Sequence, residues 1–439
     1  MKGNTSIAQH AGSVDMLPFN GLTDASIKDS WSPKVLLVTA YRWPTTTRLA
    51  LALSEAGLVV EALCPVGHSL QRVKFVAQVY RYRSLNPLRD LRNAITASRP
   101  DLIIPSDDTT AAQLHELYQL TNATDAGGNK LRSLIAHSLG DPTNYPSFYS
   151  RAGIALLANA VGVPSPTTTN IHNHDELLGQ LQNIDFPAVL KSDGSFGGMG
   201  VAIVRTRDEA ERAFGELAAY NNLTRALKRL IVNRDANLIL PWLRRTSAQV
   251  SIQRFLFGKR ANAAVACWKG AVLAQACVEV IASNNATGPA TIVRVISHPG
   301  MSQAVERLVS ALGLSGLCGF DFILDSTDGS ARLIDFNPRA TQTCHLLSSE
   351  RTQPTLSLAA KLRGLPPVVD DHLVPYRGPI ALFPHSLAYA PNSHNSEYAD
   401  IDLPSGSPEL VEVGREFHRR NNRFLAKVLR LARKERYSA

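Results

Sequence analysis

The sequence predicts an α/β protein of several domains, in which a parallel α/β domain is followed by mixed α and β structure that includes a small lid. Three observations predict this class. Short apolar strands alternate with helices from residue 34 to residue 120, a strand–glycine loop–strand–helix unit spans residues 186–220, and an acidic hairpin occupies residues 319–339. Alternating strands and helices of this length form a parallel sheet, because each helix returns the chain to the same edge.

The bulk composition is that of a globular protein with more than one core. The chain has 439 residues, 44% hydrophobic and 19% charged, and one core rarely accommodates this length. No stretch approaches the ~18 uninterrupted apolar residues of a membrane span, and the N-terminus lacks a signal pattern. The five cysteines have no CxxC spacing, which predicts buried thiols in a cytoplasmic protein. The net charge of +9 favours anionic ligands such as nucleotides or nucleic acid.

The N-terminal third is interpreted as a parallel α/β domain after a polar lead-in. Residues 1–33 have no sustained hydrophobic period and are expected to be disordered. Strands are expected at residues 34–40, 58–65 and 101–108, and helices at 45–57, 88–98 and 109–120. Asp108 is expected either to be the N-cap of the last helix or, with Asp107, to lie at the carboxyl edge of the sheet, where α/β sheets bind ligands. Residues 122–149 are expected to form a connector. The chain has neither a GxGxxG turn after its first strand nor a P-loop motif.

A glycine-rich loop joins two expected strands in the middle of the chain, at residues 186–191 and 201–204. The loop glycines are Gly194, Gly197, Gly198 and Gly200. Glycine lets backbone N–H groups approach phosphate oxygens closely, and Lys191 at the base of the loop adds a positive charge. A flexible hairpin that binds nothing would contain the same glycines, so the motif by itself leaves both interpretations open.

The acidic hairpin is the stretch most indicative of chemistry. The runs GFDFIL and ARLIDFN flank the turn DSTDG. Strand alternation places Asp335 and Asn337 on one face, and Asp321 lies across from Asp335 if the hairpin pairs in its natural register. Two carboxylates and an amide oxygen, without His or Cys, suit Mg²⁺. An ordinary polar surface hairpin is the alternative.

Four features occur in an order and spacing that resemble the ATP-grasp superfamily, which includes biotin carboxylase, carbamoyl phosphate synthetase and D-Ala–D-Ala ligase. They are Arg151, Lys191 with its glycine loop, the strand SIQRFLFG, and the hairpin ending in NPR. The resemblance covers residues 34–365, and the hairpin is its most specific part. It implies an N-terminal parallel α/β (pre-ATP-grasp) domain followed by an ATP-grasp fold of lid and central subdomains. The expected units are a lead-in at 1–33, the N-terminal domain at 34–130, a connector and helical segment at 131–182, the lid at 183–252, the central subdomain at 253–365 and a C-terminal segment with a basic helix at 366–439.

The resemblance also implies ligands and roles for individual residues. ATP phosphates would be bound by Arg151, Lys191 and the loop glycines Gly194, Gly197, Gly198 and Gly200, and the adenine edge by the main chain of Gln253 and Leu256. Two Mg²⁺ (or Mn²⁺) ions would be bound by Asp321, Asp335 and Asn337. Arg339 would face an oxyanion, and Arg294 would bind a substrate. Relatives more often have lysine at the position of Arg151 and glutamate at those of Asp321 and Asp335, so phosphate geometry and metal preference are expected to differ here.

The implied reaction is an ATP-dependent ligation. A small-molecule carboxylate would be activated as an acyl phosphate and coupled to an amine, with release of ADP and phosphate. One alternative is a bicarbonate-activating carboxylase or carbamoyl-phosphate-type enzyme, which the lack of an internal repeat and of a biotinyl motif disfavours. Another is a non-enzymatic nucleotide- or nucleic-acid-binding protein, suggested by the basic tail at 415–437. We expect small-molecule carboxylate and amine substrates, a homodimer as a possible assembly, and neither a membrane nor a nucleic-acid partner.

Overall fold

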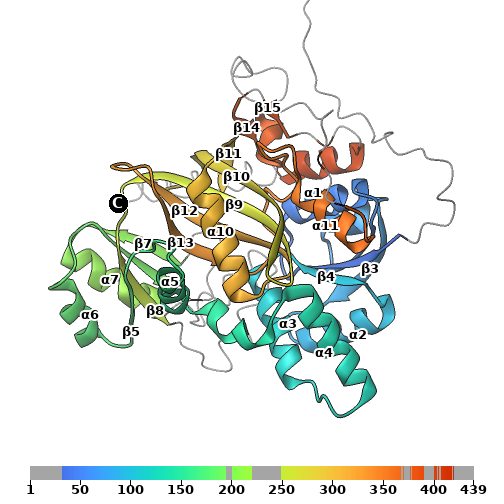
Figure 1. Cartoon of the computed structure of the whole chain (residues 1–439), viewed down its shortest axis with the longest axis horizontal. Coiled ribbons are helices and arrows are strands. Elements are labelled where there is room, and N and C mark those ends of the chain that lie inside the picture. Colours follow the sequence, from blue (N-terminus) through green and yellow to red (C-terminus); the bar gives the residue numbers. More distant parts are fainter. Residues whose placement is uncertain are drawn as a thin grey trace, which may run out of the picture.

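The computed structural model describes residues 32–193, 200–219, 249–366, 369, 376, 378–389, 400–402, 404, 407–417 and 419. Within this part the chain forms three sheets with helices packed against them, which confirms the expected α/β class (Figure 1). Three expectations fall wholly or mostly outside the described residues: the lead-in at 1–33, the loop glycines Gly194, Gly197 and Gly198, and the basic tail at 415–437.

The elements have the following bounds. The strands are β1 Lys34–Val38, β2 Val59–Pro65, β3 Val76–Tyr82, β4 Leu102–Pro105, β5 Thr168–Ile171, β6 Ala188–Ser192, β7 Val201–Val204, β8 Val250–Arg254, β9 Gly258–Trp268, β10 Ala271–Ser283, β11 Ala290–Val295, β12 Gly316–Asp325, β13 Ala331–Asn337, β14 Ile380–Ala381 and β15 Asp400–Ile401. The α-helices are α1 Pro44–Glu55, α2 Pro87–Ser98, α3 Asp108–Leu120, α4 Ala126–Leu139, α5 Arg151–Ala160, α6 His174–Leu181, α7 Arg207–Ala218, α10 Pro299–Leu312 and α11 Pro354–Leu362. The 3-10 helices are η1 Ser69–Arg72, η2 Pro142–Tyr149 and η3 His385–Tyr389.

The N-terminal sheet, made of β1 to β4, is parallel and has the strand order β3-β2-β1-β4. Its central strand β1 is apolar and almost wholly buried, as expected for a parallel sheet covered on both faces. The prediction that Asp108 caps α3 is wrong. β4 ends at Pro105, and the Oδ1 atom of Asp107 accepts the cap hydrogen bond from the Thr110 N–H at 2.9 Å. Asp108 is therefore the first helical residue, and its carboxylate is not used for capping.

The expected connector at residues 122–149 contains helix α4 and the 3-10 helix η2. α4 begins after Asp125, whose Oδ1 atom accepts a hydrogen bond from the Gly128 N–H. Its glycines Gly127 and Gly128 lower its helix propensity, which is why composition indicated a loop. Burial of Ile135 and Leu139 in the main hydrophobic core offsets this local preference.

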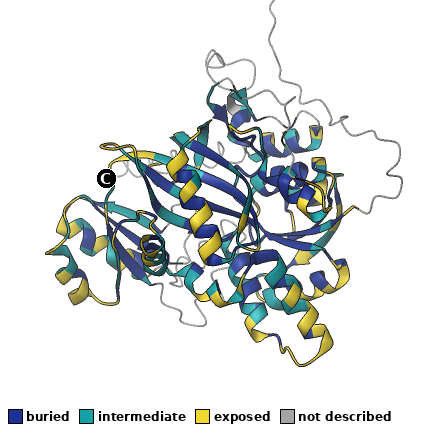
Figure 2. Ribbon diagram, viewed as in Figure 1, coloured by how far each residue is buried: buried dark blue, intermediate teal, exposed yellow. Residues whose placement is uncertain are grey.

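The central sheet has the strand order β13-β12-β9-β10-β11-β14-β15. β9 is rich in alanine and buried on both faces. Ala264 and Ala266 pack in one cluster with Val35 and Leu37 of the N-terminal sheet, so small side chains allow the two sheets to share a core. Helix α10 lies across one face of the central sheet (Figure 1), and its outer side is exposed (Figure 2).

The small sheet has the strand order β5-β8-β6-β7 and lies beside the central sheet, away from the N-terminal sheet (Figure 1). It encloses its own hydrophobic cluster, in which Leu190 of β6 packs with Ile252 of β8 and with helix α7. β5 comes from the stretch expected as connector, and β8 crosses the expected boundary at residues 252 and 253. The small sheet is therefore assembled from two separate parts of the chain.

A buried ionic cluster connects the C-terminal segment to the N-terminal domain. Asp402 accepts hydrogen bonds from Arg48 Nε of α1 and from His345 Nε2, both at 2.9 Å, and all three side chains are at most 5% exposed. Burial opposes ionisation of Asp402, but Arg48 and His345 hold its pKa well below the usual range. Burial lowers the pKa of His345, so this side chain is a neutral donor at pH 7.

Replacing Asp402 with asparagine should destabilise the fold strongly, because it leaves the Arg48 charge buried without its counter-ion. Breaking a buried pair on one side costs about 3–5 kcal/mol. The measurement is the urea midpoint of unfolding followed by circular dichroism. Arg72→Ala is the matched control: it removes an exposed pair with Glu416 between the same two segments, and exposed pairs are worth at most about 1 kcal/mol. Equal effects of the two variants would contradict the buried-cluster account.

The same cluster predicts an acid-dependent loss of stability. The folded-state pKa of Asp402 is depressed, so its contribution is complete above the unfolded pKa of about 3.9 and is lost as the pH falls below it. The urea midpoint of the wild-type protein should therefore fall between about pH 4 and pH 2 more steeply than that of Asp402→Asn. Parallel curves for the two proteins would show that Asp402 does not carry this dependence.

Candidate active site

A cavity of about 730 Å³ lies where the three sheets and the C-terminal segment meet, a size typical of small-molecule sites. Trp43 and Asp108 line it from the N-terminal domain, Val189 from the small sheet and Val278 from the central sheet. The charged lining residues among those described are Asp108, Arg151, Lys191, Asp193, Arg260, Asp321, Asp335 and Arg339. All of the predicted phosphate and metal ligands that the structure describes, except Gly200, are therefore brought to one place.

The hairpin formed by β12 and β13 has the predicted register, because Asp321 pairs with Asp335. The next pair joins Phe322 to Leu333, so Ile334 is an extra residue and forms a β-bulge. Bulges re-aim side chains beside many active sites. The carbonyl of Ile334 accepts a hydrogen bond of 2.6 Å from Lys191 Nζ of the small sheet. The small sheet therefore contacts the hairpin at the bulge.

Asp321 is held by two amide side chains. Asn262 Nδ2 donates to Asp321 Oδ1 at 2.8 Å, and Asn337 Nδ2 donates to Oδ2 at 3.0 Å. Burial raises the pKa of Asp321, and the neighbouring charge of Asp335 raises it further. A cation between the two carboxylates would offset this repulsion.

The donor set at the hairpin fits Mg²⁺. It consists of two carboxylates and one amide, all hard oxygen ligands. Within the described part of the chain, no group of three or more His, Cys, Asp or Glu side chains is placed to hold a metal ion. A metal site here would therefore depend on Asn337 and on oxygens from a substrate in addition to the two carboxylates.

Lys191 and Arg151 provide the positive charge opposite the hairpin. Lys191 is 5% exposed, and burial lowers its pKa to about 8, against the opposing effect of Asp335. Arg151 begins α5, where its Nε lies 3.6 Å from Asp335 Oδ1 and its Nη1 lies 3.7 Å from Asp193 Oδ1. Burial raises the pKa of Asp193 to about 6. Lys191 and Arg151 thus lie beside the acidic side chains of Asp193 and Asp335. A bound polyphosphate would approach this group of side chains.

Arg339 connects the hairpin to the N-terminal domain. Its Nη2 donates to Asn337 Oδ1 at 3.0 Å, and its Nε donates to Asp108 Oδ2 at 3.2 Å. Asp108 is free for this role because Asp107 caps α3. The guanidinium is therefore oriented from both sides before any ligand binds.

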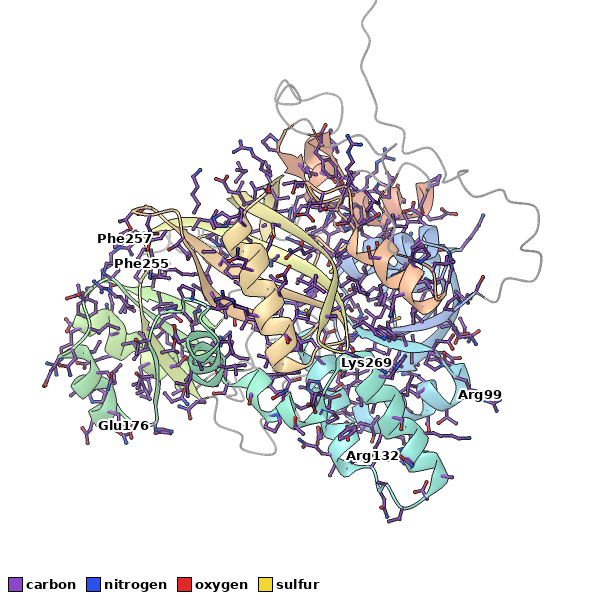
Figure 3. The ribbon with its side chains drawn as sticks, viewed as in Figure 1. Arg99, Arg132, Glu176, Phe255, Phe257 and Lys269 are labelled. Atoms are coloured by element: carbon purple, nitrogen blue, oxygen red, sulfur yellow. The ribbon has the colours of Figure 1, made fainter. Side chains whose placement is uncertain are left out.

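The residues predicted at the adenine edge lie in and after β8. Gln253 and Leu256 both line the cavity, and Gln253 pairs with β5 and β6 in the small sheet. Phe255 and Phe257 lie beside them, with ring centroids 5.0 Å apart in an edge-to-face arrangement (Figure 3). Gly200 closes the glycine loop, where its carbonyl accepts a hydrogen bond from the Ser192 N–H at 2.8 Å.

Arg294 does not lie at the cavity. It belongs to β11, and its Nη1 atom lies 3.6 Å from Glu279 of β10. Its neighbour Val293 lines the cavity, and successive side chains of a strand point to opposite faces. The register of β11 therefore directs Arg294 away from Arg339, and it has no part in the function proposed below.

Three polar residues of the site were not predicted. Asn262 supports Asp321 because β9 lies next to β12, a pairing between strands that are not consecutive in the chain. Asp193 follows the strand that carries Lys191, and Tyr149 ends η2 in the expected connector. The position of Asp193 in the printed sequence was a usable signal, since it immediately follows that strand and opens the glycine loop. Nothing local indicates Asn262.

The middle of the sequence matches a known family model. Residues 151–362 match the family model described as carbamoyl-phosphate synthase L chain, ATP binding domain. This ATP-binding segment, just under half of the chain, is of the ATP-grasp type and contains the hairpin, Lys191 and Arg151.

Individual relatives are distant. The N-terminal section of the carbamoyl phosphate synthase large chain of Methanopyrus kandleri is 22% identical over 214 residues, which cover 46% of this chain and 33% of the relative. The arginine-specific large chain of Geobacillus stearothermophilus is 22% identical over 268 residues, 59% of this chain and 22% of the relative. The match thus spans a third or less of the length of these relatives.

Solved structures share the fold over most of the chain. A biotin carboxylase domain of the 2-oxoglutarate carboxylase of Hydrogenobacter thermophilus, solved with MgADP and bicarbonate, has a TM-score of 0.55 at 16% identity over 80% of this chain and 74% of that chain. An ATP complex of carboxyaminoimidazole ribonucleotide synthase from Aspergillus clavatus has a TM-score of 0.56 at 14% identity, with 79% and 80% covered. An L-amino acid ligase from Bacillus licheniformis has a TM-score of 0.53 at 14% identity, with 79% and 78% covered.

No described helix is long and apolar enough to cross a membrane.

Asn262→Ala should weaken the metal site without unfolding the protein, because it removes the 2.8 Å hydrogen bond to Asp321. Loss of a partner that orients a metal ligand typically costs about 10–100-fold in metal affinity. The measurement is the Mn²⁺ concentration that half-saturates the protein, followed by electron paramagnetic resonance in the presence of a non-hydrolysable ATP analogue. Asn183→Ala, at an exposed position after α6, is the control. An unchanged Mn²⁺ affinity in Asn262→Ala would show that Asn262 does not support a metal ligand.

Proposed function

We propose that this protein is an ATP-dependent ligase that activates a small-molecule carboxylate as an acyl phosphate and couples it to an amine, releasing ADP and phosphate. The observation that supports this most is that two cations, the buried Lys191 and the partly buried Arg151, line the same cavity as the Asp321–Asp335 pair. Such an arrangement suits the positioning and charge stabilisation that phosphoryl transfer requires.

Each part of the site has a task in this proposal. Lys191 and Arg151 bind the phosphates of ATP, together with the glycine loop, and the main chain near Gln253 and Leu256 binds adenine. Asp321, Asp335 and Asn337 would hold Mg²⁺, which neutralises charge on the phosphoryl group in transfer. Arg339 stabilises the oxyanion of the reacting acyl group.

The reaction consists of two displacements. A carboxylate oxygen forms a bond to the γ-phosphorus of ATP while the bond between that phosphorus and the bridging oxygen of ADP breaks. The amine nitrogen then forms a bond to the acyl carbon, the bond from that carbon to the phosphate oxygen breaks, and the nitrogen loses a proton. Exclusion of water from the cavity during the reaction would protect the acyl phosphate from hydrolysis.

Bicarbonate activation is the second candidate, and the relatives favour it. The curated relatives named above are carbamoyl phosphate synthases, and the Hydrogenobacter domain was solved with bicarbonate. The L-amino acid ligase with the same fold supports the first candidate equally at the level of fold.

A substrate screen tests the proposal and separates the candidates. Purified protein is incubated with Mg²⁺, ATP and pairs drawn from panels of small carboxylates and amines, and nucleotide products are separated by chromatography. ADP formed only when an organic acid and an amine are both present supports the ligase. ADP formation that depends on bicarbonate supports the second candidate, whereas AMP and pyrophosphate would overturn acyl phosphate chemistry.

We further propose that the protein acts in the cytoplasm, and as a homodimer. All five cysteines are free and buried, as suits a reducing compartment. The biotin carboxylase domain with the same fold was solved as a dimer. Light scattering after size-exclusion chromatography measures the assembly directly, and a mass of one chain would exclude the dimer.

A further inference from the structure

The end of the cavity nearest the N-terminal domain has a different character from the phosphate end. Apolar side chains line it, among them Trp43, Leu49 and Phe148, together with the carboxylate of Asp108 and the ring of Tyr149. Arg339 lies at its boundary, because its guanidinium contacts both Asp108 and Asn337 of the hairpin. We call this region the N-terminal pocket. The pocket is thus placed where the second substrate of a ligase could approach the activated acyl group.

Asp108 provides the negative charge of the N-terminal pocket. Its Oδ2 atom accepts the hydrogen bond from Arg339, and its side chain is 19% exposed. The structure gives Oδ1 no hydrogen bond within the described residues, and Asp107 makes the helix cap instead. Asp108 therefore has an acceptor oxygen in addition to the one that orients Arg339.

Tyr149 provides a second acceptor beside it. Its hydroxyl lies 2.6 Å from Nδ1 of His115, which is 3% exposed and stacks on Tyr145 with ring centroids 3.8 Å apart. Burial lowers the pKa of His115 to about 3, so the ring is neutral. In either tautomer of a neutral histidine, the phenol oxygen keeps a lone pair that can accept a further hydrogen bond. Burial raises the pKa of Tyr149 well above its ordinary value, and the nearby charge of Asp108 raises it further.

We propose that the N-terminal pocket binds the amine substrate in its ammonium form on an apolar body, with Asp108 and the hydroxyl of Tyr149 accepting its N–H groups. This inference rests on the proposed ligase function for the role of the amine as nucleophile. A carboxylate favours an ammonium group and repels a phosphate, and the apolar walls favour a hydrocarbon or aromatic body. The proposal concerns binding, in which no covalent bond forms or breaks.

The position of Asp108 also links binding of the amine to the acyl site. One carboxylate oxygen orients Arg339, and the other would bind the ammonium group. The bound ammonium group must first lose one proton, to the Asp108 carboxylate or to water, to regain the lone pair with which it attacks. The resulting amine lies beside the guanidinium that stabilises the acyl oxyanion, which is the arrangement that a displacement at the acyl carbon needs. Asp108 would thus be a specificity-determining residue for the amine.

The test measures binding without ATP, so that it does not depend on turnover. The probe is 2-phenylethylamine, and its dissociation constant is obtained by ligand-observed NMR. The matched probes are 2-phenylethanol, which lacks the charge, and O-phosphoethanolamine, which has the ammonium group but carries a phosphate. We expect 2-phenylethylamine to bind at least about tenfold more tightly than either, since hydrogen bonds to charged groups are the stronger kind.

Substitutions in the N-terminal pocket test whether the preference for 2-phenylethylamine arises there. Asp108→Asn, which retains an acceptor for Arg339, should weaken 2-phenylethylamine about tenfold and leave 2-phenylethanol unchanged, and Tyr149→Phe should weaken the amine about threefold. Asp175→Asn, an exposed first-turn residue of α6, should change nothing. Equal binding of amine and alcohol, or full affinity in both pocket variants, would overturn the proposal.

The outcome of this binding test can be distinguished from the outcome of the substrate screen. Binding of 2-phenylethylamine through Asp108 in a protein that releases no ADP with any acid and amine would support the pocket and contradict the ligase. ADP release that requires a phosphorylated amine would support the ligase and overturn the pocket as described.

Discussion

Asp335→Asn is expected to lower the rate of ADP release by at least about 10³-fold, since metal stabilisation of a transferring phosphoryl group is worth several kcal/mol. Asp335 lies opposite Asp321 in the register of the hairpin, and its Oδ1 atom lies 3.6 Å from Arg151 Nε. The change keeps the size of the side chain and removes the charge that a divalent cation needs. Initial rates of ADP formation at saturating ATP measure the effect.

The control for this variant lies in the same hairpin. Asp328 is in the turn, with its side chain 55% exposed, so Asp328→Asn should leave the rate within about twofold and both variants should unfold near the wild-type temperature. A normal rate in Asp335→Asn would refute the metal assignment. Loss of folding in that variant alone would instead mean that the acidic pair is structural.

Lys191→Met is expected to lower kcat/KM for ATP by about 10²–10³-fold, the usual effect of removing one preorganised donor to a developing anion. Lys191 is buried at 5% exposure, and its Nζ reaches the bulge carbonyl of Ile334. Methionine retains much of the apolar stem, so the variant should still fold. Steady-state kinetics with ATP as the varied substrate measure the loss.

Lys74→Met is the matched control, because the side chain of Lys74 is 92% exposed and should not influence ATP. An equal kcat/KM for Lys191→Met and the wild type would remove the phosphate role from Lys191. Its interaction with Ile334 would then serve only to join the small sheet to the hairpin.

Local patterns were sufficient for the parts of the site that lie close together in sequence. The alternation of apolar and polar residues and the short turn determined the hairpin, so the pairing of Asp321 with Asp335 was predicted and is confirmed. Three strands of the N-terminal sheet, β1, β2 and β4, were also predictable, because each is nearly all apolar and alternates with helices of ordinary length. β3 was not predicted as a strand, because its sequence VAQVYRY mixes polar and apolar residues.

Long-range pairing explains most of what could not be predicted. Asn262 donates a hydrogen bond to Asp321 only because β9 lies between β12 and β10 in the central sheet. The order of strands in a sheet cannot be read from local sequence patterns. The same order and register turn Arg294 away from the cavity.

Two local errors have a different cause. The two glycines of α4 concealed a helix that is stabilised by tertiary burial. The choice of Asp108 rather than Asp107 as N-cap was an error of one residue. The position of Asp108 at the carboxyl edge of the sheet was expected, but its hydrogen bond with Arg339 was not.

The acyl phosphate is the central claim, and oxygen transfer tests it most directly. The carboxylate identified in the substrate screen is labelled with ¹⁸O, the reaction is run with ATP and the amine, and the inorganic phosphate is examined by ³¹P NMR. Formation of an acyl phosphate predicts that one ¹⁸O atom per turnover appears in the phosphate, because the carboxylate oxygen that attacks phosphorus leaves with it. Phosphate without label, or label found in AMP, would contradict the mechanism.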